Sequence, residues 1–306
     1  MNIDLSKNAD SAPQNDLFEA QLPKRYFFDK IFATLSWVAV SFSILVVIIL
    51  LTDVILDGLP RLDWALISQF PSRRASEAGL KSALIGTIWL MSITAIITFP
   101  LGVGAGIYLE EFSTDNLFTK IIDININNLA AVPSIIYGLL GLQLFVRVLE
   151  PITGGRSVLA GSMTLSLLIL PIVIVSTRES LKAVPDSLRQ AGLALGATKW
   201  QVVREQIFPL ALPGILTGTI LALSRAIGET APLITIGALT FIAFLSPFGL
   251  EGLQTPFTAM PIQVFNWVSR PQAEFHTAAA AGIIVLMCML LMMNGTAIYL
   301  RNRFQK

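Results

Sequence analysis

The chain has 306 residues with a formal net charge of +1; 54% of them are apolar, only 13% are charged, and the mean hydropathy is +0.71. Soluble domains carry roughly 25% charged residues, so the composition excludes an ordinary soluble domain and predicts an all-α integral membrane protein. The small net charge and the lack of a Lys/Arg run give no reason to expect nucleic-acid binding. The single cysteine, Cys288, excludes an internal disulfide and an all-cysteine metal site.

A membrane-spanning helix needs about 20 apolar residues, and the sequence contains six such windows. The polar segment 1–30 precedes the first window, which we interpret as an uncleaved membrane anchor because it is too long for a signal-peptide core. The last window is followed by the short polar tail 301–306. The six predicted spans are 31–56, 83–108, 129–148, 158–177, 211–243 and 278–300.

Lys and Arg residues in the connecting segments predict the orientation of the chain. Placing the N-terminus in the cytoplasm gives the cytoplasmic side about twice as many basic residues as the outside. We therefore expect both termini to be cytoplasmic. The connections 57–82 and 246–276 then lie outside, and their prolines predict ordered caps or short surface helices. The connection 178–209 lies inside.

The cytoplasmic connection 178–209 mixes charged residues with small ones and predicts one or two short helices on the membrane surface. One interpretation is an amphipathic helix that lies on lipid. The other is a docking site for a cytoplasmic partner, because Trp200 is a rigid anchor of the kind enriched at protein interfaces. The small residues that favour close helix contact are Ala191, Gly192, Ala194, Gly196 and Ala197.

Arg225 and Glu229 lie four residues apart within the fifth apolar window. A charge near the bilayer centre costs at least a few kcal/mol, so such residues usually face a bundle interior or a water-filled path. Arg225 lies roughly 18 Å along a helix from Pro213, too deep to reach the surface. Its planar fork of donors suits an oxyanion. The alternative is that the two charges only neutralise each other, although base before acid is the less favourable order in a helix.

Three prolines of this region are predicted helix breakers. Pro232 cannot donate to the carbonyl of Gly228 and would clash with it, so the helix should kink beside the charged pair. Exposed backbone at membrane depth is tolerated where protein or water covers it. The predicted breakers are Pro209, Pro213 and Pro232.

The motifs of nucleotide and metal chemistry are missing from the sequence. No Gly-x-x-x-x-Gly-Lys-Ser/Thr loop occurs, so we do not expect this chain to hydrolyse a nucleotide. His276 is the only histidine, and no second one is available to hold a metal-bound water. Neither a catalytic residue nor a metal ligand is predicted.

The run from Gln190 to Gly196, followed thirteen positions later by Pro209, resembles the Glu-Ala-Ala loop of ABC importer permeases. In that family a short coupling helix docks in a cleft of an ATP-hydrolysing subunit. The chain departs from the pattern at Gln190, where glutamate is usual, and at Gly192, where the second alanine is usual. The resemblance implies contact with an ATPase subunit through Gln190, Ala191, Gly192, Gly196, Ala197 and Trp200.

A second set of motifs resembles the PstA-type permease subunits of phosphate importers. It consists of Pro209–Gly218 running into Arg225–Leu233, and of Ala131–Leu139 in the third window; the resemblance covers roughly residues 80–300. It implies the ABC type I importer permease fold, with a five-helix core at 83–300 that includes the coupling loop 178–209. It also implies a cell inner membrane location and a substrate pathway along Arg225, Glu229 and Thr230.

The same resemblance implies the partners. They are a PstC-type sister permease, two copies of a PstB-type ATPase subunit that use ATP and Mg, an extracytoplasmic PstS-type phosphate-binding protein, and membrane lipid. No cofactor is expected on this chain itself. Two other functions stay open, namely a permease for molybdate, sulfate or phosphonate, and a membrane enzyme or scaffold in which Arg225 and Glu229 are structural. Glu229 is a candidate for selectivity, since its carboxylate can accept a hydrogen bond from a protonated phosphate oxygen but would repel fully deprotonated sulfate.

Overall fold

A computed structural model describes residues 22–114, 116–247 and 249–304, so most of the predicted N-terminal tail lies outside the described residues. The chain divides into two compact units, Met1–Asp53 and Val54–Lys306. Every regular element in the described ranges is helical, which agrees with the all-α prediction. Helix α1, Leu22–Gly58, provides the described part of the first unit and runs across the boundary into the second.

Five helices in the described part of the chain are long and apolar enough to cross a membrane, and a bent helix pair makes a sixth candidate. The six predicted windows therefore each correspond to a candidate span. Besides α1, the long helices are α3 (Lys81–Ile107), α7 (Val158–Lys182), α10 (Phe208–Gly228) and α14 (Ala273–Phe304).

The bent pair corrects the predicted third span, 129–148. Helix α4 (Leu117–Ala130) ends before Pro133, and α5 (Ser134–Gly141) begins after it and continues as the π-helical η5 (Leu142–Val148). The two arms meet at 105°. Proline disfavours helical backbone in the residue before it, which accounts for the position of the corner. The window was predicted as one span because α4 is too polar to be distinguished from a loop.

The predicted fifth span, 211–243, is also corrected. Its helix starts earlier, because α9 (Lys199–Val202), the π-helical η6 (Val203–Ile207) and α10 form one continuous candidate span, Lys199–Gly228. Two predicted breakers do not interrupt this span. Pro209 lies in the first turn of α10, just after the π-helical η6. Pro213 lies inside α10.

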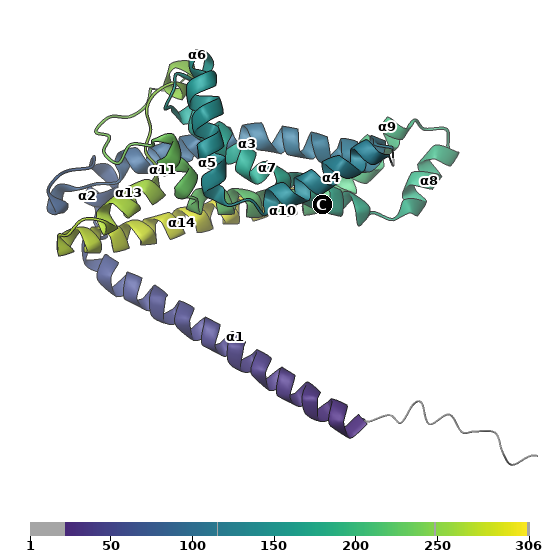
Figure 1. Cartoon of the computed structure of the whole chain (residues 1–306), viewed down its shortest axis with the longest axis horizontal. Helices are drawn as coiled ribbons and strands as arrows, with labels where there is room; N and C mark the ends of the chain where they lie inside the picture. Colours follow the sequence, from purple (N-terminus) through teal and green to yellow (C-terminus); the bar gives the residue numbers. More distant parts are fainter. Residues whose placement is uncertain (1–21, 115, 248, 305–306) are drawn as a thin grey trace, which may run out of the picture. The chain divides into compact units, whose positions relative to one another are not determined.

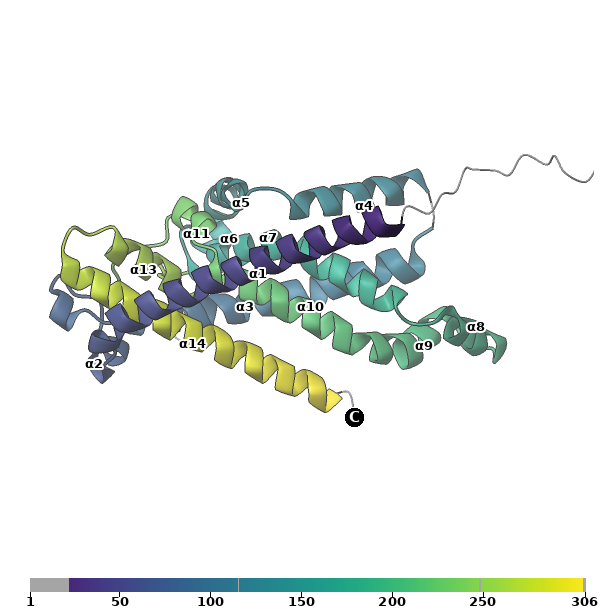
Figure 2. The ribbon, with the colours of Figure 1, turned by 90° about the horizontal axis from the view of Figure 1, so that it is seen from below.

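Four long helices of the second unit, α3, α7, α10 and α14, run alongside one another (Figures 1 and 2). Helix α7 is central, and its Leu165, Ile169 and Val173 are fully buried. Since lipid is as apolar as leucine, helix association in a membrane depends on close packing and hydrogen bonds between helices. The Ser162 hydroxyl, for example, donates to the Leu90 carbonyl of α3 at 3.2 Å.

Glycines allow the close approach of these helices. On α3, a Cβ added to Gly102 would lie 2.7 Å from Val173 Cγ1, and one added to Gly106 would lie 2.7 Å from Thr177 Cβ. On α10, a Cβ at Gly214 would lie 2.5 Å from Ser180 Oγ. Helices α3 and α10 therefore both pack closely against α7.

Short helices occupy the two ends of this bundle (Figure 2). Helices α2 (Trp64–Ser68) and α13 (Met260–Val268) lie at one end, within the connections that were predicted to hold short helices. Helix α8 (Asp186–Ala194) and helix α9 lie at the opposite end and form the predicted helices of the 178–209 connection. The remaining short elements are η2 (Leu59–Arg61), η3 (Ala75–Glu77), η4 (Tyr108–Phe112), α6 (Glu150–Thr153), α11 (Ala231–Ile236) and α12 (Leu250–Leu253).

Candidate functional site

Helix α10 stops beside its arginine, and the chain continues in a separate helix. Gly228 is the last residue of α10, and Glu229 is extended, with φ −78° and ψ 106°. Helix α11 begins at Ala231 with Pro232 in its first turn. The predicted kink is therefore a full break over Glu229 and Thr230, for the predicted reason: Pro232 cannot join the hydrogen-bond ladder of α10.

Arg225 and Glu229 form an ion pair at this break. Arg225 Nε lies 3.3 Å from Glu229 Oε1, and the side chains are 47% and 19% exposed, respectively. Within the described part of the chain, the two terminal nitrogens of Arg225 have no hydrogen-bond partner. A guanidinium has five N–H donors, so pairing through Nε leaves four of them available. The predicted mutual neutralisation is thus present, and it leaves most of the donors of Arg225 free.

Helix α5 packs directly against this break. A Cβ added to Gly138 would lie 2.7 Å from Pro232 Cα and 2.8 Å from Thr235 Cβ, so only glycine allows the backbones to approach this closely. The neighbouring Tyr137 is 4% exposed, and it lies within electrostatic range of Arg225. The break is therefore held in place by a second interrupted span.

Tyr137 also fixes the corner between α4 and α5, because its hydroxyl donates to the Leu129 carbonyl at 2.7 Å. Tyr137 and Gly138 had no assigned role in the sequence analysis, although both lie in the Ala131–Leu139 motif. A tyrosine within an apolar window was the available signal, since a buried tyrosine hydroxyl needs a partner.

The predicted coupling residues lie on α8, on α9 and in the turn between them. Gly196 in that turn has φ +82°, in the left-handed region that favours glycine. Gly192 makes α8 and α9 pack closely, since a Cβ there would lie 2.6 Å from Val202 Cγ2. Leu195, which was not singled out in the sequence, is 88% exposed at the tip. Of the predicted residues, Gln190, Ala191, Gly196 and Trp200 are exposed, and Gly192 and Ala197 are half-buried.

Trp200 is 56% exposed and also touches the body of the second unit. Its ring centroid lies 6.1 Å from that of Phe112, the last residue of η4. The Lys199 ammonium lies 5.5 Å from the same Phe112 ring. The α9 end of the loop is therefore attached to η4, which follows the C-terminal end of α3, through aromatic and cation–π contacts.

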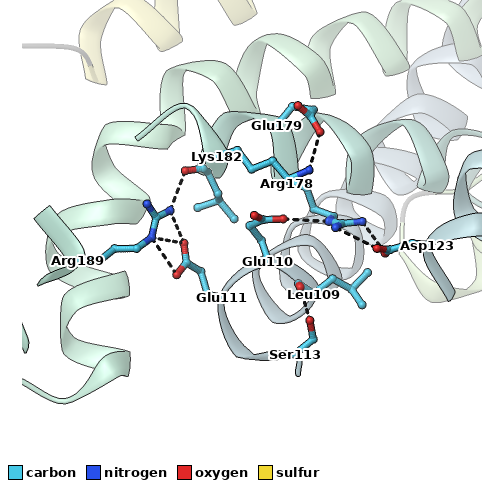
Figure 3. A network of polar contacts seen from close by, with 10 residues as sticks. Leu109, Glu110, Glu111, Ser113, Asp123, Arg178, Glu179, Lys182 and Arg189 are labelled. Carbon is cyan, nitrogen blue, oxygen red and sulfur yellow. Dashed lines mark hydrogen bonds and ion pairs between the residues drawn. The ribbon is translucent and has the colours of Figure 1, made fainter. Parts of the chain in front are cut away.

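An ionic network joins the same region to α8 (Figure 3). Arg189 Nη2 lies 2.7 Å from Glu111 Oε1, and Glu111 is only 4% exposed. Arg189 also donates to the carbonyls of Leu181 and Val184, where α7 ends. The hydrogen bonds to Glu111 raise the pKa of Arg189 above its usual value, so the arginine stays charged.

A second arginine extends the network to α4. Arg178 binds Asp123 through two hydrogen bonds, 2.6 and 3.2 Å long, and Glu110 at 3.2 Å. The sequence analysis used Arg178 and Arg189 only to orient the chain and missed the carboxylates. No local pattern could pair them, because each arginine is more than fifty positions from its acidic partner on η4 or α4.

Known proteins resemble this chain in sequence. The family described as "Binding-protein-dependent transport system inner membrane component" matches residues 99–306. The phosphate transport system permease protein PstA of Haemophilus influenzae is 32% identical over 90% of this chain and 94% of its own length. The PstA protein of Yersinia pestis is 32% identical over 87% of each chain.

Solved structures resemble the fold. A chain of a bacterial alginate ABC transporter matches with a TM-score of 0.66 and 13% identity, over 92% of this chain and 98% of that one. A chain of the inward-facing MetNI methionine ABC transporter matches with a TM-score of 0.54 and 17% identity, over 72% and 95%. At these identities the likeness establishes the fold alone, which is that of ABC importer permeases.

The family match covers more than half of the chain, and the PstA relatives match nearly all of it. The helices also supply the membrane spans that such a protein requires. The chain therefore belongs to the family of binding-protein-dependent transport system inner membrane components, as a multi-pass permease subunit of the PstA type.

Proposed function

We propose that this permease subunit carries inorganic phosphate across the cell inner membrane as part of an ATP-driven ABC importer. Two PstA proteins named for phosphate transport match most of the chain, which supports phosphate over molybdate, sulfate or phosphonate. The translocation pathway is formed together with a PstC-type sister permease. A PstS-type extracytoplasmic protein delivers the phosphate.

The observation that carries the proposal is the state of Arg225. It sits at the end of a broken span, is 47% exposed in the single chain, and its terminal N–H groups have no partner among the described residues. Phosphate near neutral pH is a mixture of singly and doubly charged anions whose oxygens match a guanidinium fork. Arg225 binds the passing anion, Glu229 accepts a hydrogen bond from its protonated oxygen, and Thr230 lies in the same break.

Energy comes from another subunit, because the sequence has no phosphate-binding loop of its own. Two copies of a PstB-type ATPase subunit use ATP and Mg, and one of them receives the α8–α9 loop. The exposed Leu195 and Trp200 supply the apolar contacts of that docking. This chain acts as a non-catalytic membrane subunit and binds no cofactor.

The proposed topology places both termini in the cytoplasm. Residues 1–30 form a cytoplasmic tail, 31–56 the first span and 57–82 an extracytoplasmic connection. The permease core occupies 83–300, with the coupling loop 178–209 on the cytoplasmic side, and 301–306 form the C-terminal tail. Lipid surrounds the outward apolar faces.

The test is transport by the assembled complex in proteoliposomes. The complete complex with its binding protein should accumulate labelled phosphate only when ATP and Mg are present on the ATPase side. An excess of sulfate, molybdate or phosphonate should leave this uptake unchanged. Accumulation of one of those anions in preference to phosphate would contradict the substrate, and no ATP-dependent accumulation would contradict the transport function.

A further inference from the structure

Helix α4 packs along α7 but lies at the outside of the second unit. None of its residues is buried, and Leu117, Phe118, Ile121 and Ile124 are all more than half exposed. Its described contacts include two polar links, one halfway along the helix and one at its C-terminal end. An element held in this way can move as a rigid arm when either link moves.

The first link joins α4 to the coupling loop. Asp123 of α4 binds Arg178 of α7, which also binds Glu110 of η4. The next residue of η4, Glu111, binds Arg189 of the coupling helix α8. All five side chains are at most 29% exposed, so these charge-assisted bonds are only partly screened by water.

The π-helical turn η4 is the junction of this network (Figure 3). Glu110 contacts α7, Glu111 contacts α8, and Phe112 contacts Trp200 of α9. Three consecutive side chains therefore bind three different helices. Single π-helical turns are frequently found at functional sites. A cavity of about 440 Å³ beside Glu110, Glu111 and Arg189 leaves space for these side chains to shift.

The second link joins α4 to α11, the helix that follows the break beside Arg225. The Tyr137 hydroxyl donates to the Leu129 carbonyl at the end of α4. Tyr137 is followed by Gly138, which packs against Pro232 of α11. A displacement of α4 would therefore pull on α5 and, through Gly138, on the backbone next to Glu229.

We propose that α4 is a lever that connects the coupling loop to the Arg225–Glu229 break, with Asp123 and Tyr137 as its positioning residues. The inference rests on the proposed function, since it describes how ATP-driven movement of the loop reaches the anion. Energetic coupling between distant sites requires an element with two arrangements that both sites bias. In this proposal the α4–α5 corner is that element, because the Asp123–Arg178 link and the contact of Gly138 with Pro232 both act on it.

The test measures phosphate uptake and ATP hydrolysis together in proteoliposomes that contain the complete complex and its binding protein. The variants are Asp123→Asn, Tyr137→Phe and their combination. The conservative variant is Asp123→Glu, and the matched control on the same helix is Asn127→Ala, whose side chain is exposed. Co-purification of the ATPase subunit with every variant shows that the complex has assembled.

We expect Asp123→Asn and Tyr137→Phe each to lower the phosphate transported per ATP hydrolysed by about two- to thirtyfold. ATP hydrolysis should continue, because docking of the loop is unaffected. Asp123→Glu should keep most of the wild-type ratio of transport to hydrolysis, because its carboxylate can still bind Arg178. Asn127→Ala should leave the ratio unchanged. The double variant should lose less than the product of the two single losses, because both links belong to one lever.

A ratio of transport to hydrolysis that is unchanged in both single variants would overturn the inference, whether the two rates stay at the wild-type level or fall in proportion. The inference would also be overturned if Asp123→Glu lowered the phosphate transported per ATP as much as Asp123→Asn does. A wild-type complex that accumulates no phosphate would overturn the proposed function and this inference with it. Normal wild-type uptake with unaffected variants would overturn the inference alone.

Discussion

Arg225 Nε lies 3.3 Å from Glu229 Oε1 across the point where α10 ends. The pair stands at the helical i, i+4 spacing, yet Glu229 has already left the helix, so the carboxylate belongs to the break and the guanidinium to the helix. A movement of the break relative to α10 therefore changes the distance between the two charges. Such a movement would expose or cover the arginine without moving the helix that carries it.

Glu229→Gln should weaken the discrimination between phosphate and sulfate. The carboxylate can accept a hydrogen bond from a protonated phosphate oxygen, whereas it repels fully deprotonated sulfate. Excess sulfate, which should leave wild-type uptake unchanged, should therefore inhibit phosphate uptake by this variant. Glu251→Gln, an exposed acid on α12, is the control. If sulfate inhibits Glu229→Gln no more than wild type, Glu229 does not contribute to the discrimination between phosphate and sulfate.

Gly138→Ala should impair transport far more than Gly104→Ala. The new methyl at 138 would meet the Pro232 backbone at 2.7 Å, and backbone cannot rotate away as a side chain can. At Gly104 nothing lies within 4 Å of the added atom, and alanine is the better helix former by about 1 kcal/mol. Initial uptake rates of the two variants at equal membrane abundance test this. Equal rates would show that the α5–α11 contact can be loosened without consequence.

Leu195→Glu should reduce the amount of ATPase subunit that co-purifies with the permease. Leu195 is 88% exposed at the tip of the α8–α9 turn, so the substitution does not disturb the core. Leu62→Glu, at an exposed leucine in the connection 57–82 at the other end of the bundle, should leave the yield of the complex unchanged. If the two variants retain the ATPase equally well, the loop tip is not the docking surface.

Arg189→Ala should lower the thermal stability of the purified subunit. It leaves the 4% exposed Glu111 without its counter-charge, and breaking a buried pair from one side costs about 3 kcal/mol. Replacing both partners, as in Arg189→Met with Glu111→Leu, should recover part of that loss. The recovery should be incomplete because Arg189 also binds the carbonyls of Leu181 and Val184.

Arg74→Ala is the control for this measurement. Its ion pair with Glu77 is exposed, at 78% and 55%, and such pairs contribute less than about 1 kcal/mol. Melting temperatures measured in the same detergent compare the two pairs. Equal melting temperatures of the Arg189→Ala and Arg74→Ala subunits would show that the contact of Arg189 with Glu111 does not stabilise the fold.

The sequence predicted the features that follow from local chemistry. Apolar length located the spans, Pro232 indicated the interruption after α10, and the small residues of the 178–209 connection include Gly192, which lies at a close helix contact. The prediction failed where context decides: Pro213 is accommodated inside α10 and Pro209 follows a π-helical turn. It also failed for α4, because that helix is too polar to be recognised as part of a span. The ion pairs of Glu110, Glu111 and Asp123 were missed because these residues are distant in sequence from their arginines.

The central claim is that Arg225 binds the anion in transit, and phosphate uptake by assembled complexes with Arg225→Ala or Arg225→Lys tests it most directly. Alanine should lower uptake about ten- to hundredfold, since hydrogen bonds to a charged group contribute about 1.5–3 kcal/mol. Lysine should leave a substantial defect because it lacks the planar fork. Arg74→Ala again serves as the control. Wild-type uptake by an assembled Arg225→Ala complex would contradict the account.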